Sequence, residues 1–266
     1  MWRSYKRRGY TKKYKKNMSK KTDYRTYQFS GKEWAENLLR GILLVLLLGY
    51  FFYRSVLWTC LLSPLVFFYL KSRKEELAQK RRRQLGNQFK DTLSSLNGSI
   101  QAGYSIENAF TEAYREISAY YGEDSMIAKE LAGICFGVHN NRQVEELVQD
   151  FGHRSGVDDI LEFGNVLMIG KKSGGNLNEI IQTSISVISD KMETKQEIET
   201  LISAKKLEAS IMAVIPFLII LYIEMTSAGY FDSLYQSMGG RILMSVCFVV
   251  YMTAVKMTKK IVHIEV

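Results

Sequence analysis

The chain has 266 residues, 47% of them hydrophobic, and carries a formal net charge of +9. Its three cysteines form no recognisable disulfide framework and its three histidines lack metal-ligand spacing, so composition excludes a disulfide scaffold and a zinc site. Residues 1–33 hold 12 Lys or Arg against two acids, a net charge of +10, so the rest of the chain is close to neutral.

The first segment, residues 1–35, is a basic arm that we predict to be disordered and cytoplasmic. Aromatic residues such as Trp2, Tyr5 and Tyr10 alternate with its basic residues, a pattern that also occurs in proteins that bind single-stranded nucleic acid. We prefer contact with anionic membrane lipid, because a cationic segment beside an apolar block enforces orientation, and we do not expect nucleic acid as a partner. The arm is too long for the n-region of a cleavable signal peptide.

The first apolar block, Gly41–Leu70, is too long for one membrane span. As a single helix it would extend about 45 Å, whereas the hydrocarbon core of a bilayer is about 30 Å thick, and Arg54 would lie near its middle. We therefore predict two short helices, about 36–53 and 55–71, with Arg54 at the external turn; a single kinked or re-entrant span is the alternative. Basic residues on both flanks favour an even number of crossings.

The second apolar block contains two spans, Ser210–Thr226 and Gly240–Met257, separated by the polar turn Ser227–Gly239. Lysines precede and follow the pair, so we again expect cytoplasmic flanks around an external loop. The only two prolines of the chain, Pro64 and Pro216, fall inside apolar spans, where each favours a kink.

Between the two blocks, residues 72–209 show helical periodicity with almost no strand alternation. The apolar stripe Phe89, Leu93, Leu96 and Ile100 predicts a helix that ends at Gly103, and Ser105 is a suitable N-cap for the next one. Six helices are predicted in this region. The first ends at Gly103, the second is Ile106–Tyr120, and the third starts at Asp124 or Ser125. The fourth is capped by Asn141, the fifth is Asp158–Lys172, and the sixth runs from Leu177 to Ile215, into the third span.

The turn Ser173–Asn176 joins the last two of these helices. Gly174 and Gly175 permit the positive φ values of a tight reversal. Asn176, with Glu179 three residues later, resembles a capping box in which Asn takes the place of Ser or Thr. We therefore predict that these residues form a structural turn.

The segment Gly170–Ser173 lacks the spacing of a phosphate-binding loop, because position 165 is Asn and Lys171 is followed by Lys172. We interpret the two lysines as complements of the helix C-terminal dipole and as candidate contacts for a partner. No G-x-S-x-G motif is present, and paired carboxylates occur at helix starts. Glu224, near the end of an apolar span, is interpreted as exposed at the membrane interface. We expect no enzymatic activity, no catalytic residue, no cofactor and no metal.

These elements predict an all-α membrane protein in which a cytoplasmic six-helix bundle is flanked by two transmembrane helical hairpins. The predicted segments are the arm (1–35), the N-terminal hairpin (36–71), the bundle (72–209), the C-terminal hairpin (210–258) and a short C-terminus (259–266), with both chain ends cytoplasmic.

Three stretches resemble the F domain of type II secretion systems. Leu96–Phe110 is similar to its first motif, the segment around Gly103 and Ser105, and Gly170–Leu177 is similar to its second helical turn. The last stretch, Lys259–Val266, resembles the C-terminus of the TadB group, the platform proteins of the Tad (Flp) pilus. The resemblance covers about residues 40–266, and the cationic arm lies outside the usual pattern.

This resemblance implies a non-enzymatic platform in the bacterial inner membrane. Such a platform receives motion from a hexameric cytoplasmic ATPase and helps to lift pilin or pseudopilin subunits from the membrane. A second, TadC-like platform subunit is the implied partner, within a homo- or hetero-oligomer. A TadC-like subunit, a small membrane transporter or channel, and a membrane sensor that signals through the long last helix are the alternatives.

Overall fold

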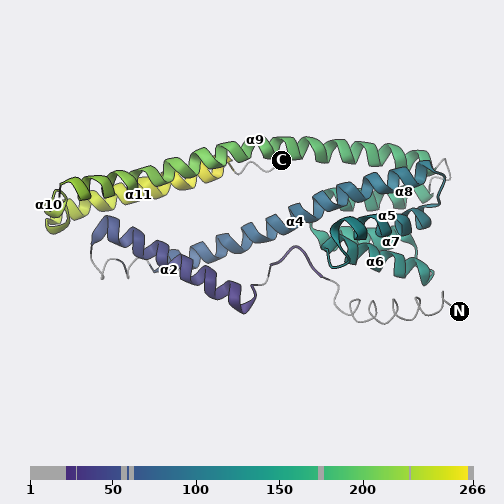
Figure 1. Cartoon of the computed structure of the whole chain (residues 1–266), viewed down its shortest axis with the longest axis horizontal. Helices are drawn as coiled ribbons and strands as arrows, with labels where there is room; N and C mark the ends of the chain where they lie inside the picture. The colour runs from purple at the N-terminus through teal and green to yellow at the C-terminus, as the bar shows by residue number, and fades with distance from the viewer. Residues whose placement is uncertain are drawn as a thin grey trace. The chain divides into compact units, whose positions relative to one another are not determined.

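The computed structural model describes residues 22–27, 29–54, 59, 63–172, 177–227 and 229–262. Within these ranges all regular secondary structure is helical (Figure 1). The chain divides into two compact units. The bundle unit comprises Met1–Tyr27 and Glu76–Thr194, and the apolar unit comprises Gln28–Glu75 and Lys195–Val266.

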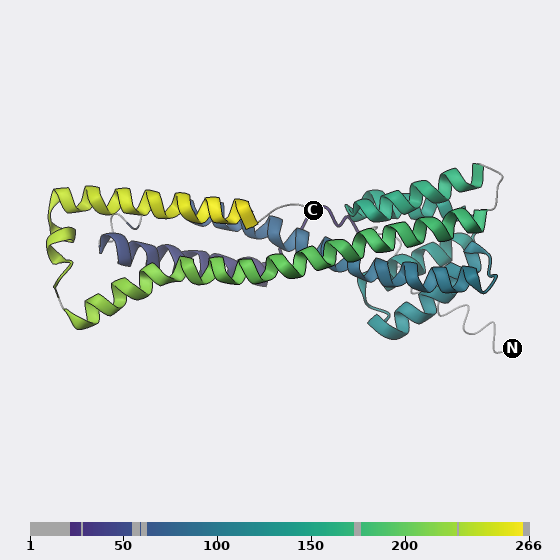
Figure 2. The same ribbon diagram turned by 90° about the horizontal axis from the view of Figure 1, so that it is seen from above.

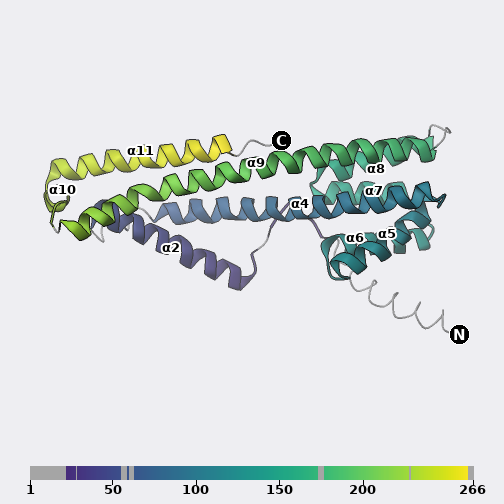
Figure 3. The same cartoon turned by 45° about the horizontal axis from the view of Figure 1, so that its top comes forward.

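The described part of the bundle unit contains four short helices and parts of two long ones, and Figure 3 shows them. These are the later part of α4 (Pro64–Gln101), α5 (Ile106–Tyr121), α6 (Met126–His139), α7 (Val144–Ser155), α8 (Asp158–Lys172) and the first part of α9 (Leu177–Thr226). One apolar core joins all six, and the predicted stripe of Phe89, Leu93, Leu96 and Ile100 is buried in it. The helical periodicity of this region is confirmed.

Helix starts in the bundle follow ordinary capping chemistry, with one correction to the sequence analysis. The hydroxyl oxygens of Ser105 and Ser125 accept from backbone N–H groups at the starts of α5 and α6. The prediction that Asn141 caps the fourth helix is wrong, because α7 begins at Val144 with Gln143 as its N-cap. Asn141 instead adopts φ +59 in the turn after α6, a conformation that asparagine tolerates better than most residues.

Two glycines allow α7 and α8 to pack backbone against backbone. A Cβ atom on Gly152 would lie 2.7 Å from the Cα of Leu161, and one on Gly164 would lie 3.0 Å from the Cα of Gln149. A Cβ atom at either position would lie closer to the facing main chain than ordinary van der Waals contact allows, so the backbone would have to shift. The close approach of these two helices therefore depends on the missing side chains.

The apolar unit contains α2 (Gly31–Tyr53), the start of α4, the end of α9, α10 (Asp232–Gln236) and α11 (Met238–Val262). Among the described residues, three helical stretches are long and apolar enough to cross a membrane: Gly31–Tyr53, Glu179–Thr226 and Met238–Thr258. The first was predicted to begin at residue 36. It starts five residues earlier because Ser30 and Glu33 form a capping box.

After Arg54 the chain returns along α2. Val66 and Tyr69 of α4 lie against Gly41, and Thr59 lies so close to Gly49 that a Cβ atom there would overlap it. These pairs run in opposite sequence directions, which is the register of two antiparallel helices.

Both long helices differ from the predicted boundaries. The predicted helix over 55–71 and the first bundle helix are one helix, α4, which begins at Pro64. Pro64 therefore occupies a helix start, where a proline costs no hydrogen bond, and the kink predicted there is wrong. The sixth helix, predicted to run from Leu177 to Ile215 into the third span, is indeed continuous with that span, and α9 extends further than predicted, through Pro216 to Thr226 (Figure 2).

Candidate functional site

The structure describes two of the turn residues that were predicted from the sequence, Gly103 and Ser105. Gly103 adopts φ +87 in the turn between α4 and α5, and Ser105 is the N-cap whose hydroxyl oxygen accepts from the Asn108 N–H at 3.5 Å. Gly174, Gly175 and Asn176 lie outside the described residues. Lys171 and Lys172 form the last turn of α8, but the described structure does not include their side chains.

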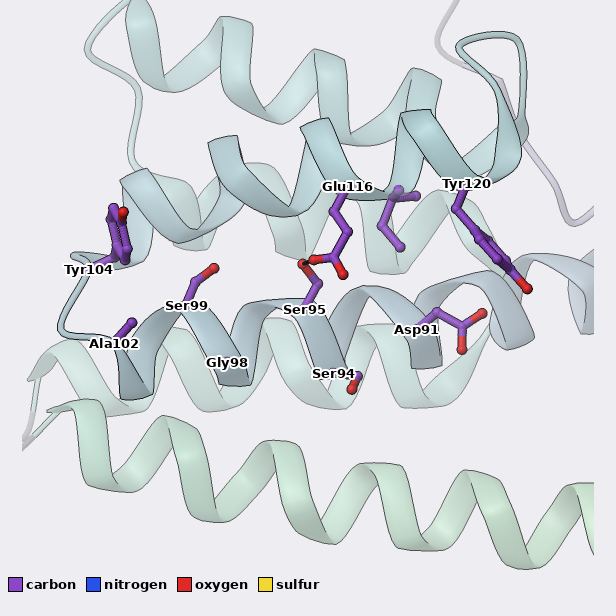
Figure 4. A pocket seen from close by; sticks show the side chains of 10 residues that line it. Asp91, Ser94, Ser95, Gly98, Ser99, Ala102, Tyr104, Glu116 and Tyr120 are labelled. Atoms are coloured by element: carbon purple, nitrogen blue, oxygen red, sulfur yellow. Dashed lines mark hydrogen bonds between the residues drawn. The ribbon is translucent and has the colours of Figure 1, made fainter.

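A groove of about 550 Å³ runs between α4 and α5, and we call it the α4–α5 groove. Small α4 residues, Ser94, Ser95, Gly98, Ser99 and Ala102, form much of its lining. Figure 4 shows Tyr104 at one end and Tyr120 at the other. Both tyrosines are half exposed or more, so their rings are available to a bound group.

Two carboxylates give the groove its electrostatic character. Glu116 accepts a hydrogen bond from the Ser95 hydroxyl, and Asp91 accepts one from the Tyr121 hydroxyl. Burial, together with the hydrogen bond to Asp91, raises the pKa of Tyr121 to about 12. No basic side chain is among the described residues that line the groove. Carboxylates between exposed aromatic rings suit an ammonium or guanidinium group.

A second constellation lies where the end of the arm meets the bundle. Tyr24 is only 3% exposed. Its hydroxyl donates to Glu130 Oε1 at 3.0 Å, and its backbone N–H donates to the Arg154 carbonyl at 2.9 Å. The guanidinium of Arg81 lies 4.7 Å from the centre of its ring. We call Tyr24, Arg81, Glu130 and Arg154 the Tyr24 latch.

Arg154 is the charged centre of this latch. Its guanidinium makes two bonds to the Glu130 carboxylate, at 2.8 and 3.1 Å, and one to Asp150 at 3.0 Å. It also donates to the Thr22 carbonyl at 3.1 Å. Burial and the negative charge of Glu130 raise the pKa of Tyr24 well above its ordinary value, so this tyrosine remains a neutral hydrogen-bond donor.

The latch corrects the prediction that the whole of residues 1–35 is disordered. Residues 22–27 lie against the bundle, and residues 31–35 belong to α2. The only local signal in the sequence is Asp23, whose carboxylate accepts from the Arg25 N–H at 2.9 Å and so favours a turn. The partners of Tyr24 are more than 50 residues away along the chain, which hides the latch from pattern analysis.

A third constellation, in the apolar unit, involves Arg54. This residue ends α2 with φ +47, and its guanidinium pairs with Glu224 of α9 and, at 3.3 Å, with Asp232 of α10. It also lies 5.3 Å from the centre of the Tyr235 ring, and the Tyr235 hydroxyl donates to the Phe51 carbonyl at 2.6 Å. Glu224 therefore has a specific partner, which the sequence analysis missed.

The carboxylates of these constellations are engaged with neighbouring side chains. Among the described residues, no group of three or more His, Cys, Asp or Glu side chains could hold a metal ion. The described partners of the carboxylates in the groove and in the latch are Ser, Tyr and Arg side chains, which suit binding and positioning.

No family model, curated protein or solved structure matches the chain.

Proposed function

We propose that this protein is a non-enzymatic platform in the bacterial inner membrane, belonging to a Tad/Flp-type pilus or a type II-like secretion machine. It couples a cytoplasmic assembly ATPase to the extraction and polymerisation of pilin subunits. The observation that carries this proposal is α9, a single 50-residue helix with a part in each of the two units.

The two ends of α9 have different surroundings. Ile181, Ile185 and Ile188 are buried in the core of the bundle unit. The later apolar stretch has no buried residue, and side chains such as Met212 and Leu218 are more than half exposed. An apolar surface of this size is stable against lipid or a partner helix but not against water. At 1.5 Å per residue the helix is about 75 Å long, so it is a direct mechanical connection between a cytoplasmic body and the membrane.

Charge and packing support a topology of two hairpins. Lys71, Lys74, Lys205 and Lys206 lie at the polar ends of the apolar stretches, where the positive-inside rule favours the cytoplasm. The Arg54 cluster holds the C-terminal end of α2 beside that of α9, as expected if both helices end at the external surface. In this proposal the bundle unit and both chain ends are cytoplasmic.

The partners follow from this arrangement. The cytoplasmic face of the bundle would contact the ATPase, with Lys171 and Lys172 as candidate contacts, and the exposed apolar helices would contact membrane lipid, pilin or a second TadC-like platform subunit. The same surfaces permit a homo- or hetero-oligomer.

Genetic deletion tests the function. Loss of the gene should abolish surface pili or secreted pilin while pilin synthesis continues, and normal piliation in the deletion strain would contradict the proposal. A matched pair of variants tests the role of α9. Thr200 is exposed on α9 beyond the last core residue, Met192, so Thr200→Pro interrupts the helix without touching the core.

We expect Thr200→Pro to abolish assembly at normal protein levels in the membrane, and Thr200→Ala to support it. Normal assembly by both variants would show that α9 is a passive stalk rather than a coupling element.

A further inference from the structure

We propose that the α4–α5 groove binds residues 1–21, the N-terminal part of the chain's own cationic arm. These residues directly precede the Tyr24 latch, and 'the arm' below means residues 1–21. This inference concerns the bundle unit alone and does not rest on the proposed function. It assigns an occupant to the groove and a role to the basic residues at the N-terminus.

The charge of the arm complements that of the groove. Residues 1–21 contain ten Lys or Arg and no acid. Across the groove from α4, residues 104–125 contain five acids and one base, and the groove itself presents Asp91 and Glu116. The two segments therefore carry opposite charges.

The chemistry of the groove matches the side chains of the arm. Small residues such as Gly98 leave space between the helices, and Tyr104 and Tyr120 stand at its two ends. Lysine and arginine place their methylene groups on apolar or aromatic surface while the charged end reaches a carboxylate. The aromatic residues of the arm, among them Tyr10 and Tyr14, suit the same surface.

The arm is long enough to reach the groove. The latch fixes Thr22 and Tyr24 to the bundle, with Arg81 of α4 over the Tyr24 ring. Along α4, Asp91 is about 15 Å from Arg81, and the groove continues for about 17 Å to Ala102. An extended arm of 21 residues spans about 70 Å, so it covers this distance with slack.

Tethering makes weak contacts sufficient. Because residues 1–21 are covalently joined to the latch, their effective concentration at the bundle surface is about millimolar. The contacts should be sensitive to salt, because exposed charges are screened within about 3 Å at 1 M ionic strength compared with about 10 Å at 0.1 M.

Photo-cross-linking of the full chain tests the proposal. The protein is placed in nanodiscs of neutral phosphatidylcholine with p-benzoylphenylalanine in place of Tyr120, which is 78% exposed at the end of the groove. The control carries the same group in place of Val187, which is 58% exposed on α9 of the bundle unit. Peptides cross-linked within one chain are identified by mass spectrometry.

We expect severalfold more cross-linking to residues 1–21 from position 120 than from position 187, and loss of that excess at 1 M salt. The double variant Asp91→Asn, Glu116→Gln should reduce it severalfold, since the amides keep a hydrogen-bond acceptor but remove both charges. Unchanged circular dichroism and melting temperature establish that this variant is folded.

Three results would overturn the proposal. Equal yields from positions 120 and 187 would show that the arm has no preference for the groove. Loss of the cross-link when anionic lipid is added at ordinary salt would assign the arm to the membrane surface. Cross-links from an arm-deleted, photo-labelled chain to the arm of a second chain, at the same yield as in the full chain, would show that docking is not intramolecular.

Discussion

Replacement of Arg54 by Gln tests the cluster that holds the ends of α2 and α9 together. The substitution removes the positive charge and leaves the carboxylates of Glu224 and Asp232 without their partner. Gln has the same disadvantage as Arg at positive φ, so backbone strain cancels in the comparison. We therefore expect the loss of stability to report the charge interactions.

The exposure of the three side chains sets the magnitude. Arg54 and Glu224 are 31% and 26% exposed, whereas Asp232 is 54% exposed. An exposed ion pair contributes about 0–1 kcal/mol, whereas breaking a fully buried pair costs about 3–5 kcal/mol. The Arg54–Glu224 pair lies between these limits, so we expect Arg54→Gln to cost about 2–3 kcal/mol. Glu224→Gln should cost about 1–2 kcal/mol, because Arg54 keeps Asp232, and Asp232→Asn less than about 1 kcal/mol.

The assay is reversible unfolding in mixed detergent micelles, followed by circular dichroism, for the wild type, Arg54→Gln, Glu224→Gln and the double variant. The double-mutant cycle should give a coupling energy of about 1–2 kcal/mol between the two residues. A coupling energy within about 0.3 kcal/mol of zero would contradict the predicted stabilisation by the Arg54–Glu224 pair, because it would mean that the two charges do not stabilise one another.

Three further predictions concern the bundle unit. Gly152→Ala, whose Cβ would lie 2.7 Å from the Leu161 backbone, should destabilise the protein by about 1–3 kcal/mol. Gly133→Ala, in α6 with open space around it, should instead stabilise it by about 0.5–1 kcal/mol. Chemical denaturation measures both changes, and equal effects would contradict the close packing of α7 on α8. Burial raises the pKa of the Cys135 thiol to about 11, so at pH 8 only about one thiol in a thousand is ionised. In a chain whose other cysteines, Cys60 and the exposed Cys247, are replaced by serine, alkylation of Cys135 should be far slower in the folded protein than after denaturation, and equally fast labelling would contradict its partial burial. Tyr24→Ala should increase the rate of tryptic cleavage in the adjoining arm severalfold. Tyr24→Phe, which keeps the ring under Arg81, should increase that rate by a smaller factor. Cleavage at the wild-type rate in both variants would show that the latch does not hold the arm.

Sequence periodicity predicts most of the bundle. Apolar residues at helical spacing, such as Phe89, Leu93 and Ile117, are the ones that the structure buries, because amphipathic helices have few other ways to cover an apolar face. Helix boundaries were predicted less well. Nothing in the composition marks where a polar helix becomes an apolar one, so α4 was divided at a point where the backbone continues. The absence of Pro and Gly from 177–215 did indicate the continuity of α9, but its end at Thr226 was not predicted.

The constellations of interest could not be read from local pattern. Tyr24 meets Glu130, and Arg54 meets Glu224, only after the chain has folded. Capping and periodicity describe neighbours within about four residues, whereas these pairs are separated by 106 and 170 positions. Asn141 shows the same limit within a single turn. An asparagine can cap a helix with its side chain or adopt positive φ in a turn, and the sequence does not tell which of the two it does; in the structure it adopts positive φ.

In the topology that we propose, the bundle unit lies on the cytoplasmic side and the Arg54 cluster on the external side of the inner membrane. Single cysteines at Tyr120 and Tyr230, both exposed, in a chain whose three native cysteines are replaced by serine, test it most directly in spheroplasts with a membrane-impermeant maleimide. We expect position 230 to be labelled in intact spheroplasts, and position 120 only after the membrane is permeabilised. Labelling of position 120 in intact spheroplasts would contradict it.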